Sequence, residues 1–158
     1  MSQGDSGIDL ETSMGYLVKE VSSALRAAME EVLRPLGMNI THYSCLELLA
    51  QRPGLSNSDL ARGTFVTRQS MNVLLQTLER DGEVVRDAVP TSGKALPTEL
   101  TPRGRERLAA ATAAVRGVEL RMLADIDDPD RQTVFLALRR MARALREPRR
   151  ATDASPER

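Results

Sequence analysis

Apolar residues recur every three or four positions along three long stretches of the chain, and this period predicts amphipathic helices. The stretches cover residues 8–36, 102–126 and 128–145. Gly37 is a plausible stop for the first, Thr101 and Pro102 open the second, and the acidic run at 127–130 separates the second from the third. The apolar stripes contain Leu17, Val18, Val21, Leu25, Ala28, Met29, Val32 and Leu33, then Leu108, Val115, Val118, Met122 and Leu123, then Val134, Phe135, Leu138, Met141 and Leu145.

Three shorter helical patterns fill the middle of the chain. The first is capped by Thr41 and ends at residues 52–54, with Tyr43, Leu46, Leu49 and Ala50 facing inward. The second covers about residues 57–62 and the third residues 68–81.

The two helices at residues 57–62 and 68–81 carry clear terminal signals. Ser56 is an N-cap type, and Asp59 three residues later makes a variant of the capping box. Thr67 caps the next helix, and Gly82 suits the left-handed residue that ends it.

Two β-prone runs follow, Val84-Val85 and residues 97–100, around a polar loop at residues 88–96. Helix, turn, helix and β-loop together describe a winged helix-turn-helix, whose second helix is of a size to enter a DNA major groove. The sequence therefore predicts double-stranded DNA as a partner.

The long terminal helices have more apolar surface than such a small core needs. A second copy of the chain, related by a two-fold axis, is the simplest cover for that surface. A two-fold axis also places two recognition helices one DNA turn apart, as a pseudo-palindromic site requires.

Composition narrows the class of protein. The chain of 158 residues is 41% hydrophobic and 28% charged, with no net charge, so the indication of DNA comes from architecture rather than from basicity. No apolar run is long enough to cross a bilayer, so we expect no membrane partner. One cysteine cannot form an internal disulfide, and the expected compartment is the cytoplasm.

At this point a family resemblance is visible in four segments, GYLVKE, RPGLSNSDLAR, VTRQSMNVLLQTLERDGEVVR and LTPRGRERL. With the helix order, they resemble the MarR family of transcriptional regulators over about residues 14–145. The resemblance implies an obligate homodimer that represses transcription. It also implies release by a small, often aromatic or anionic, effector that binds between the dimerisation and DNA-binding regions.

The expected fold is mainly α with a small β wing, a winged helix-turn-helix with long N- and C-terminal dimerisation helices. Residues 39–101 form the DNA-binding domain, and residues 13–38 and 102–147 form the dimerisation helices. Residues 1–12 and 148–158 are expected to be flexible tails.

The chain departs from the family in its wing. The usual wing carries an Asp that braces an Arg for the minor groove, but Ser92 and Lys94 occupy these positions here. Lys94 can still meet phosphate as a point charge, although it lacks the planar fork of arginine.

The helical period of residues 68–81 places Met71, Leu74 and Leu78 on a buried side and Gln69, Asn72 and Gln76 away from it. Amides can bond adenine edges and arginine can bond guanine. The alternative is an ordinary solvated helix face. The expected DNA contacts are Ser56, Thr67, Arg68, Gln69, Ser70, Asn72, Val73, Gln76, Arg86 and Lys94.

An effector cleft of the kind that the resemblance implies would be flanked by Tyr16, Arg26, His42 and Tyr43. A tyrosine or histidine that gives one polar contact in an apolar pocket suits an aromatic acid. These side chains fit equally well as buried, hydrogen-bonded core residues.

Other chemistry has little support. Cys45 lies among apolar positions and is expected to be a small core residue, with a cysteine-based redox sensor as the alternative. His42 and Cys45 are too few ligands for a metal site. The sequence contains no nucleophile elbow and no glycine-rich phosphate loop, so we expect neither an enzyme nor a cofactor. A scaffold that binds proteins rather than DNA is the third class.

Overall fold

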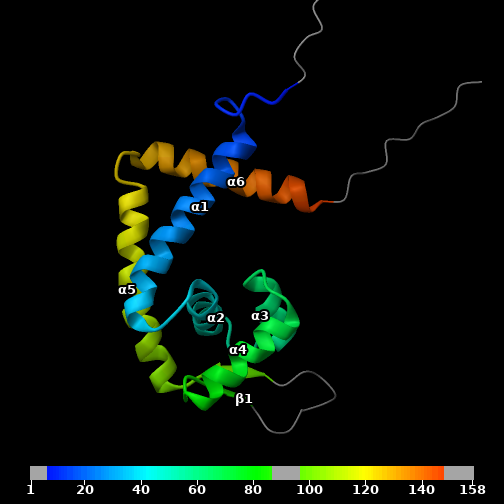
Figure 1. Cartoon of the computed structure of the whole chain (residues 1–158), viewed down its shortest axis with the longest axis vertical. Helices are drawn as coiled ribbons and strands as arrows, with labels where there is room; N and C mark the ends of the chain where they lie inside the picture. The colour runs from blue at the N-terminus through cyan, green and yellow to red at the C-terminus, as the bar shows by residue number, and fades with distance from the viewer. Residues whose placement is uncertain (1–6, 87–96, 148–158) are drawn as a thin grey trace, which may run out of the picture. The chain divides into compact units, whose positions relative to one another are not determined.

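The structure is a computed structural model that describes residues 7–86 and 97–147 (Figure 1). Within these ranges it has six α-helices, one 3₁₀ helix and two strands. In chain order they are α1 (Met14–Leu33), η1 (Arg34–Leu36), α2 (Ile40–Gln51), α3 (Asn57–Gly63), α4 (Arg68–Arg80), β1 (Val84–Arg86), β2 (Thr98–Leu100), α5 (Pro102–Met122) and α6 (Asp128–Arg146).

Local capping fixes the ends of α3 and α4 as the sequence predicts. The Ser56 side chain accepts a hydrogen bond from the amide of Asp59, and the Asp59 carboxylate accepts one from the amide of Ser56, which completes the capping box of α3. Thr67 caps α4 through the amide of Ser70. Gly82 follows α4 with φ of 73°, a conformation that costs glycine nothing.

The first helix is shorter than the predicted range of residues 8–36. It begins only after Ser13, whose side chain accepts a hydrogen bond from the amide of Tyr16. Its far end tightens into η1 around Pro35, because proline removes a backbone donor, and Gly37 closes the turn with φ of 66°.

Two other helix boundaries also differ from prediction. α2 is capped by Asn39, which accepts from the amide of His42 at 2.8 Å, and not by Thr41. α5 ends at Met122 rather than near Ile126. Beyond it the guanidinium of Arg131 donates to the carbonyls of Leu123 and Ile126, which satisfies acceptors that a longer helix would have used.

The predicted strands pair as an antiparallel hairpin, with Val84 opposite Leu100 and Arg86 opposite Thr98. A third segment joins this sheet, because Thr98 exchanges backbone hydrogen bonds with Leu55 and Gly54 on the loop before α3. This bridge ties the wing to the start of the helix-turn-helix. The loop of the wing, with Ser92 and the predicted DNA contact Lys94, lies outside the described residues.

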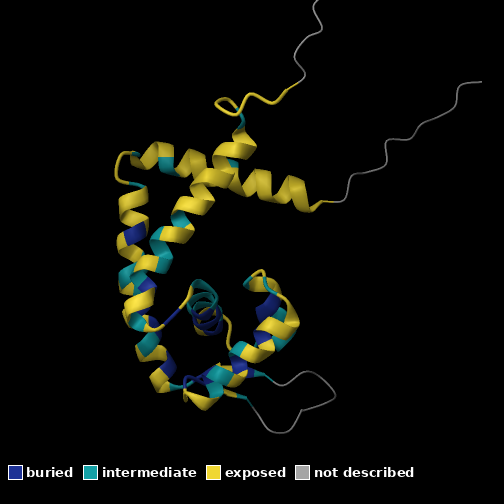
Figure 2. Ribbon diagram, viewed as in Figure 1, coloured by how far each residue is buried: buried dark blue, intermediate teal, exposed yellow. Residues whose placement is uncertain are grey.

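The chain divides into two units, Met1–Glu119 and Leu120–Arg158. The core belongs to the first unit, where Leu33, Leu46, Leu60, Leu75 and Leu78 have no exposed surface. Figure 2 shows buried positions on α2, α3, α4 and α5, and none on α6. The winged helix-turn-helix therefore has its own core.

The buried side of two helices differs from prediction by one residue each. On α4, Leu75 is buried with Met71 and Leu78, while Leu74 is only half-buried against the core. On α2, Ala50 is exposed although it was expected inside. Each helix is turned slightly relative to its sequence pattern, because contacts with neighbouring helices decide which flank is covered.

Candidate nucleic-acid interface

The exposed side of α4 is a row of polar side chains. Arg68, Gln69, Ser70, Asn72 and Gln76 are all exposed, as is the apolar Val73 at 59%. The opposite side is anchored by Met71, Leu75 and Leu78, which are fully buried. The helix thus presents amide and guanidinium groups from a fixed position, which is what reading of base edges requires.

The start of α4 is held firmly. The Thr67 hydroxyl donates to Ser70 Oγ at 2.9 Å and accepts from the Ser70 amide at 3.1 Å. The Asn57 side chain donates to the carbonyl of Arg68 at 3.2 Å, which joins the beginnings of α3 and α4. Thr67 and Ser70 therefore bond each other in the free chain, while their positions remain exposed.

Ser56 is engaged in its capping box. Its hydroxyl donates to Asp59 Oδ2 at 2.6 Å, and Arg62 also pairs with this carboxylate. The hydrogen bonds from Ser56, and the nearby Arg62, lower the pKa of Asp59. The same carboxylate thus orders the first turn of α3.

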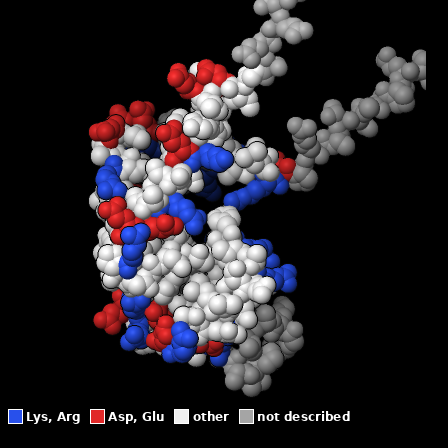
Figure 3. All heavy atoms as spheres, in the orientation of Figure 1, with Lys and Arg blue, Asp and Glu red and all other residues white. Residues whose placement is uncertain are grey.

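Arg86 lies on β1 and forms an ion pair with Glu79 of α4. It is less available to a ligand than Arg68, whose exposed side chain forms no ion pair with the described residues. Charge is sparse over this region. Figure 3 shows a largely uncharged expanse over α3 and α4, with lysines and arginines in small groups at its edges.

The four expected effector residues are not gathered into one site. Tyr16 and Arg26 are exposed on α1, and Arg26 pairs with Glu30 at 3.2 Å. His42 is buried. Tyr43 is half-buried near Thr112 of α5, and burial is the main cause that raises the pKa of its phenol.

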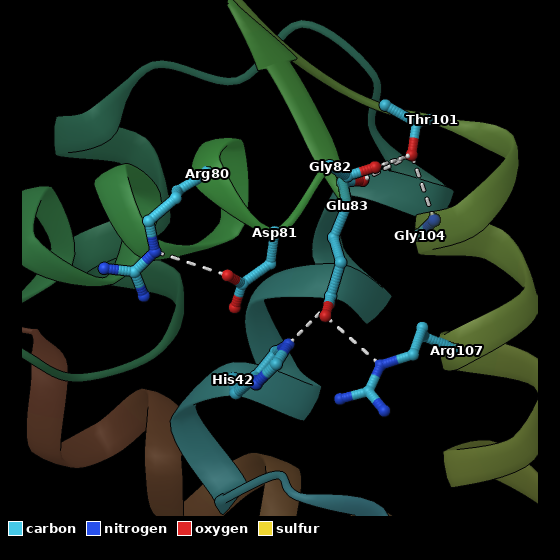
Figure 4. A network of polar contacts seen from close by, with 8 residues as sticks. All are labelled: His42, Arg80, Asp81, Gly82, Glu83, Thr101, Gly104 and Arg107. Atoms are coloured by element: carbon cyan, nitrogen blue, oxygen red, sulfur yellow. Dashed lines mark hydrogen bonds and ion pairs between the residues drawn. The ribbon is translucent and has the colours of Figure 1, made fainter.

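His42 belongs to a buried charge network that the sequence did not reveal (Figure 4). Its Nε2–H donates to Glu83 Oε2 at 2.7 Å, and Arg107 Nε donates to Glu83 Oε1 at 3.1 Å. Glu83 is only 2% exposed. A carboxylate directly before the apolar pair Val84-Val85 was the available signal, but its partners lie 41 and 24 positions away.

The backbone of Glu83 is also fixed. The Thr101 hydroxyl donates to the carbonyls of Gly82 at 2.6 Å and Glu83 at 3.1 Å, and accepts from the amide of Gly104 at 3.0 Å. Glu83, three residues after the end of α4, is thereby bound to α2 and α5 through its side chain and to Thr101, the residue before α5, through its backbone.

A shallow cavity of about 440 Å³, open to solvent, lies along α5 beside Glu47 of α2 within the first unit. Its walls combine apolar atoms of Leu108 with the charged groups of Arg105, Arg116 and Glu47 and the hydroxyl of Thr112. Since Tyr43 lies near Thr112, this predicted effector residue is close to the same cavity without lining it.

Cys45 has no exposed surface, and its Sγ lies 3.9 Å from the sulfur of Met71. Burial raises its pKa to about 12. The prediction of a small core residue is confirmed. Among residues 7–86 and 97–147 no three potential ligands gather for a metal ion, and no helix is long and apolar enough to cross a membrane.

Comparison with known proteins gives a consistent result. A sequence model of the MarR family matches residues 36–95. The HTH-type transcriptional repressor Rv2887 of Mycobacterium tuberculosis is 40% identical over 126 residues, which cover 80% of this chain and 91% of the repressor.

Solved structures agree. The crystal structure of Rv2887 with salicylic acid has a TM-score of 0.65 at 40% identity, covering 85% of this chain and 96% of that one. Its complex with DNA has a TM-score of 0.66 at 36% identity, covering 86% and 99%. A MarR family regulator from Silicibacter pomeroyi, 24% identical, shares the fold with a TM-score of 0.80 over 90% of this chain and 97% of its own.

Proposed function

Because this chain belongs to the MarR family of transcriptional regulators, we propose that it is a homodimeric repressor that binds a pseudo-palindromic operator. The observation that carries the proposal is the polar row of Gln69, Asn72 and Gln76 on a helix whose other side is locked into the core. The family consists of regulators rather than enzymes, and such a protein acts in the compartment that holds the chromosome, here taken as the cytoplasm.

The exposed residues at α4 divide by chemistry into those that suit base edges and those that suit the phosphate backbone. Asn72, Gln69 and Gln76 can each form paired hydrogen bonds with adenine, and Arg68 with guanine. Hydroxyls such as those of Thr67 and Ser70 suit phosphate oxygens, which set the register without reading sequence. We propose that Arg86 contributes less to DNA affinity than Arg68, because Glu79 already neutralises the charge of Arg86.

The test compares Asn72→Ala with Gln51→Ala, a matched loss of an exposed amide at the end of α2. Binding is titrated by gel shift or anisotropy with the intergenic DNA beside the gene and with a scrambled duplex, at several salt concentrations. Asn72→Ala should cost about 1–3 kcal/mol on the cognate duplex and little on the scrambled one. Gln51→Ala should match the parent on both.

The two duplexes make the result decisive. Equal loss of affinity on both duplexes would show that Asn72 does not read a base. Absence of binding by the parent to any duplex from that region, at low salt, would remove the proposed function itself.

An aromatic acid is the effector class that we propose. Rv2887 has been crystallised with salicylic acid, and the cavity along α5 offers apolar walls with two guanidinium groups, from Arg105 and Arg116. Such a lining suits a planar ring that carries a carboxylate. Tyr43 lies beside it, whereas His42 is already bonded to Glu83.

Salicylate titrated into the protein–DNA complex tests this site. Arg116→Ala should require several times more salicylate for release from DNA, because it removes a cation from the cavity. Arg26→Ala removes an exposed arginine of α1 and serves as the matched control, with release unchanged. If Arg26→Ala raised the salicylate requirement and Arg116→Ala did not, the effector site would lie on α1 near Tyr16 instead.

A further inference from the structure

Phe65, in the turn between α3 and α4, has an unusual conformation. Its φ is 59°, and among the described residues it is the one residue other than glycine with a positive φ. Its side chain is 84% exposed. A large aromatic ring therefore stands in water from a backbone position that side chains rarely adopt.

Folding of the chain alone gives no reason for a phenylalanine at this position. Left-handed backbone brings Cβ close to the following carbonyl oxygen, and glycine avoids this cost. The ring buries very little apolar surface, so its packing does not offset the cost of this backbone conformation. An unfavourable backbone that is kept without a packing benefit points to a role in binding.

The turn holds the ring in a defined place. Thr64 bonds the carbonyl of Leu60 with its amide at 2.9 Å and its hydroxyl at 2.8 Å, and the amide of Val66 donates to Ala61 at 3.0 Å. The amide of Phe65 itself donates to Arg62 at 3.3 Å. Because the backbone is already ordered, binding of a ligand to the ring costs little additional conformational entropy of the protein.

The position of the ring indicates its partner. Phe65 lies two residues before Thr67, the cap of α4, in the turn that leads into the proposed DNA-reading helix. Arg68, three residues after Phe65, is exposed and forms no ion pair with the described residues, whereas the exposed Arg62 already pairs with Asp59. A cation close in sequence to an exposed apolar ring suits a duplex, which offers phosphates next to deoxyribose carbons and thymine methyl groups.

We propose that the Phe65 ring is a direct DNA contact that packs on apolar atoms at the edge of the major groove, either a thymine methyl group or a deoxyribose. The inference rests on the proposed function, since it adds a residue of the turn before α4 to the proposed DNA contacts. The polar side chains of α4 would recognise bases through hydrogen bonds. The Phe65 ring would instead recognise methyl groups and the shape of the duplex through apolar contact.

The test uses Phe65→Gly and Phe65→Asn, two substitutions that suit left-handed backbone but lack the ring. Both should unfold at the same temperature as the parent or higher, and both should bind the cognate duplex about tenfold more weakly. Phe65→Leu, which keeps apolar surface, should lose less. Sedimentation of each variant without DNA should match the parent.

Replacement of thymine by deoxyuridine in the duplex distinguishes the two sources of apolar atoms. If the ring packs on a methyl group, the parent loses affinity on the substituted duplex and Phe65→Gly loses nothing further. If it packs on deoxyribose, deoxyuridine has no effect and Phe65→Gly is weaker on every duplex.

Two results would overturn the proposal. One is parental DNA affinity in both Phe65→Gly and Phe65→Asn. The other is a changed dimer equilibrium without loss of DNA affinity, which would assign the ring to a protein contact. Failure of the proposed function looks different, because the parent would then bind none of the duplexes.

Discussion

At the scale of single residues, Gly104 marks a close approach between α5 and the segment that joins α4 to β1. A methyl group at this position would lie 2.1 Å from the carbonyl oxygen of Glu83, which is backbone and cannot rotate away. Gly117, on the same helix, has nothing within 4 Å of that point. The two glycines thus provide a matched pair with opposite expectations.

Gly104→Ala should lower the free energy of unfolding by about 1–3 kcal/mol, because α5 must shift away from Glu83. Gly117→Ala should raise it by about 0.5–1 kcal/mol through helix propensity alone. Urea unfolding of both variants at one protein concentration measures this difference. Equal effects of the two substitutions would contradict the close approach.

Cys45 should play no part in sensing oxidants. The thiol is buried and its pKa is raised to about 12, so the reactive thiolate is scarce in the folded protein at neutral pH. DNA binding by the parent and by Cys45→Ser should therefore respond identically to hydroperoxide. Release of the parent alone would establish the redox alternative.

The same pKa shift has a defined effect on stability. Folding favours the neutral thiol, so this contribution is complete below the ordinary value of 9.0 and is lost as the pH rises towards about 12. Comparison of parent and Cys45→Ser in urea at neutral and alkaline pH should show their difference shrinking in the alkaline range.

At the scale of elements, Glu83 links α2, the end of α4 and α5. Glu83→Ala leaves His42 buried without its partner and frees Arg107, and it should cost on the order of 3 kcal/mol. Asp81→Ala, two residues earlier, removes an exposed pair with Arg80 and should cost below about 1 kcal/mol. Thermal unfolding distinguishes them, and similar losses would show that the network contributes no more than a surface pair.

Local signals in the sequence predicted the helix-turn-helix well because each cap is made within three residues. Ser56 with Asp59, and Thr67 with Ser70, need no distant partner. Glu83 was missed for the opposite reason, since its role depends on residues from two other helices. The candidate site divides in the same way. The exposed row of α4 followed from the helical period, whereas the cavity near Arg116 depends on how α2 and α5 pack.

At the scale of the whole molecule, many of the exposed large apolar side chains lie on the long helices α1 and α6. Among the described residues every fully buried large side chain lies in the first unit, while α6 buries none of its residues. Large apolar side chains exposed on α1 and α6 include Met14, Leu17, Val18, Val21, Val134, Phe135, Leu136, Leu138, Met141 and Leu145. This is the surface that we propose a second copy covers.

Leu138→Asp should convert the dimer into monomers without unfolding the first unit, because a charge on the apolar side of α6 cannot be buried unpaired. Binding to a two-site operator should weaken sharply as the second recognition helix is lost. Gln132→Ala, an exposed change on the same helix, should do neither. Light scattering measures the mass, and a dimeric Leu138→Asp would place the interface elsewhere.

The absence of buried residues on α6 also has a consequence for amide hydrogen exchange. A helix whose apolar side is covered only by a partner is protected in proportion to the amount of partner present. Amides of α6 should therefore exchange faster as the protein is diluted, whereas those of α2 and α4 should exchange at rates independent of concentration. In a cell, the abundance of the protein would then set the fraction of molecules with an ordered α6. The same fraction would be able to bind both halves of an operator.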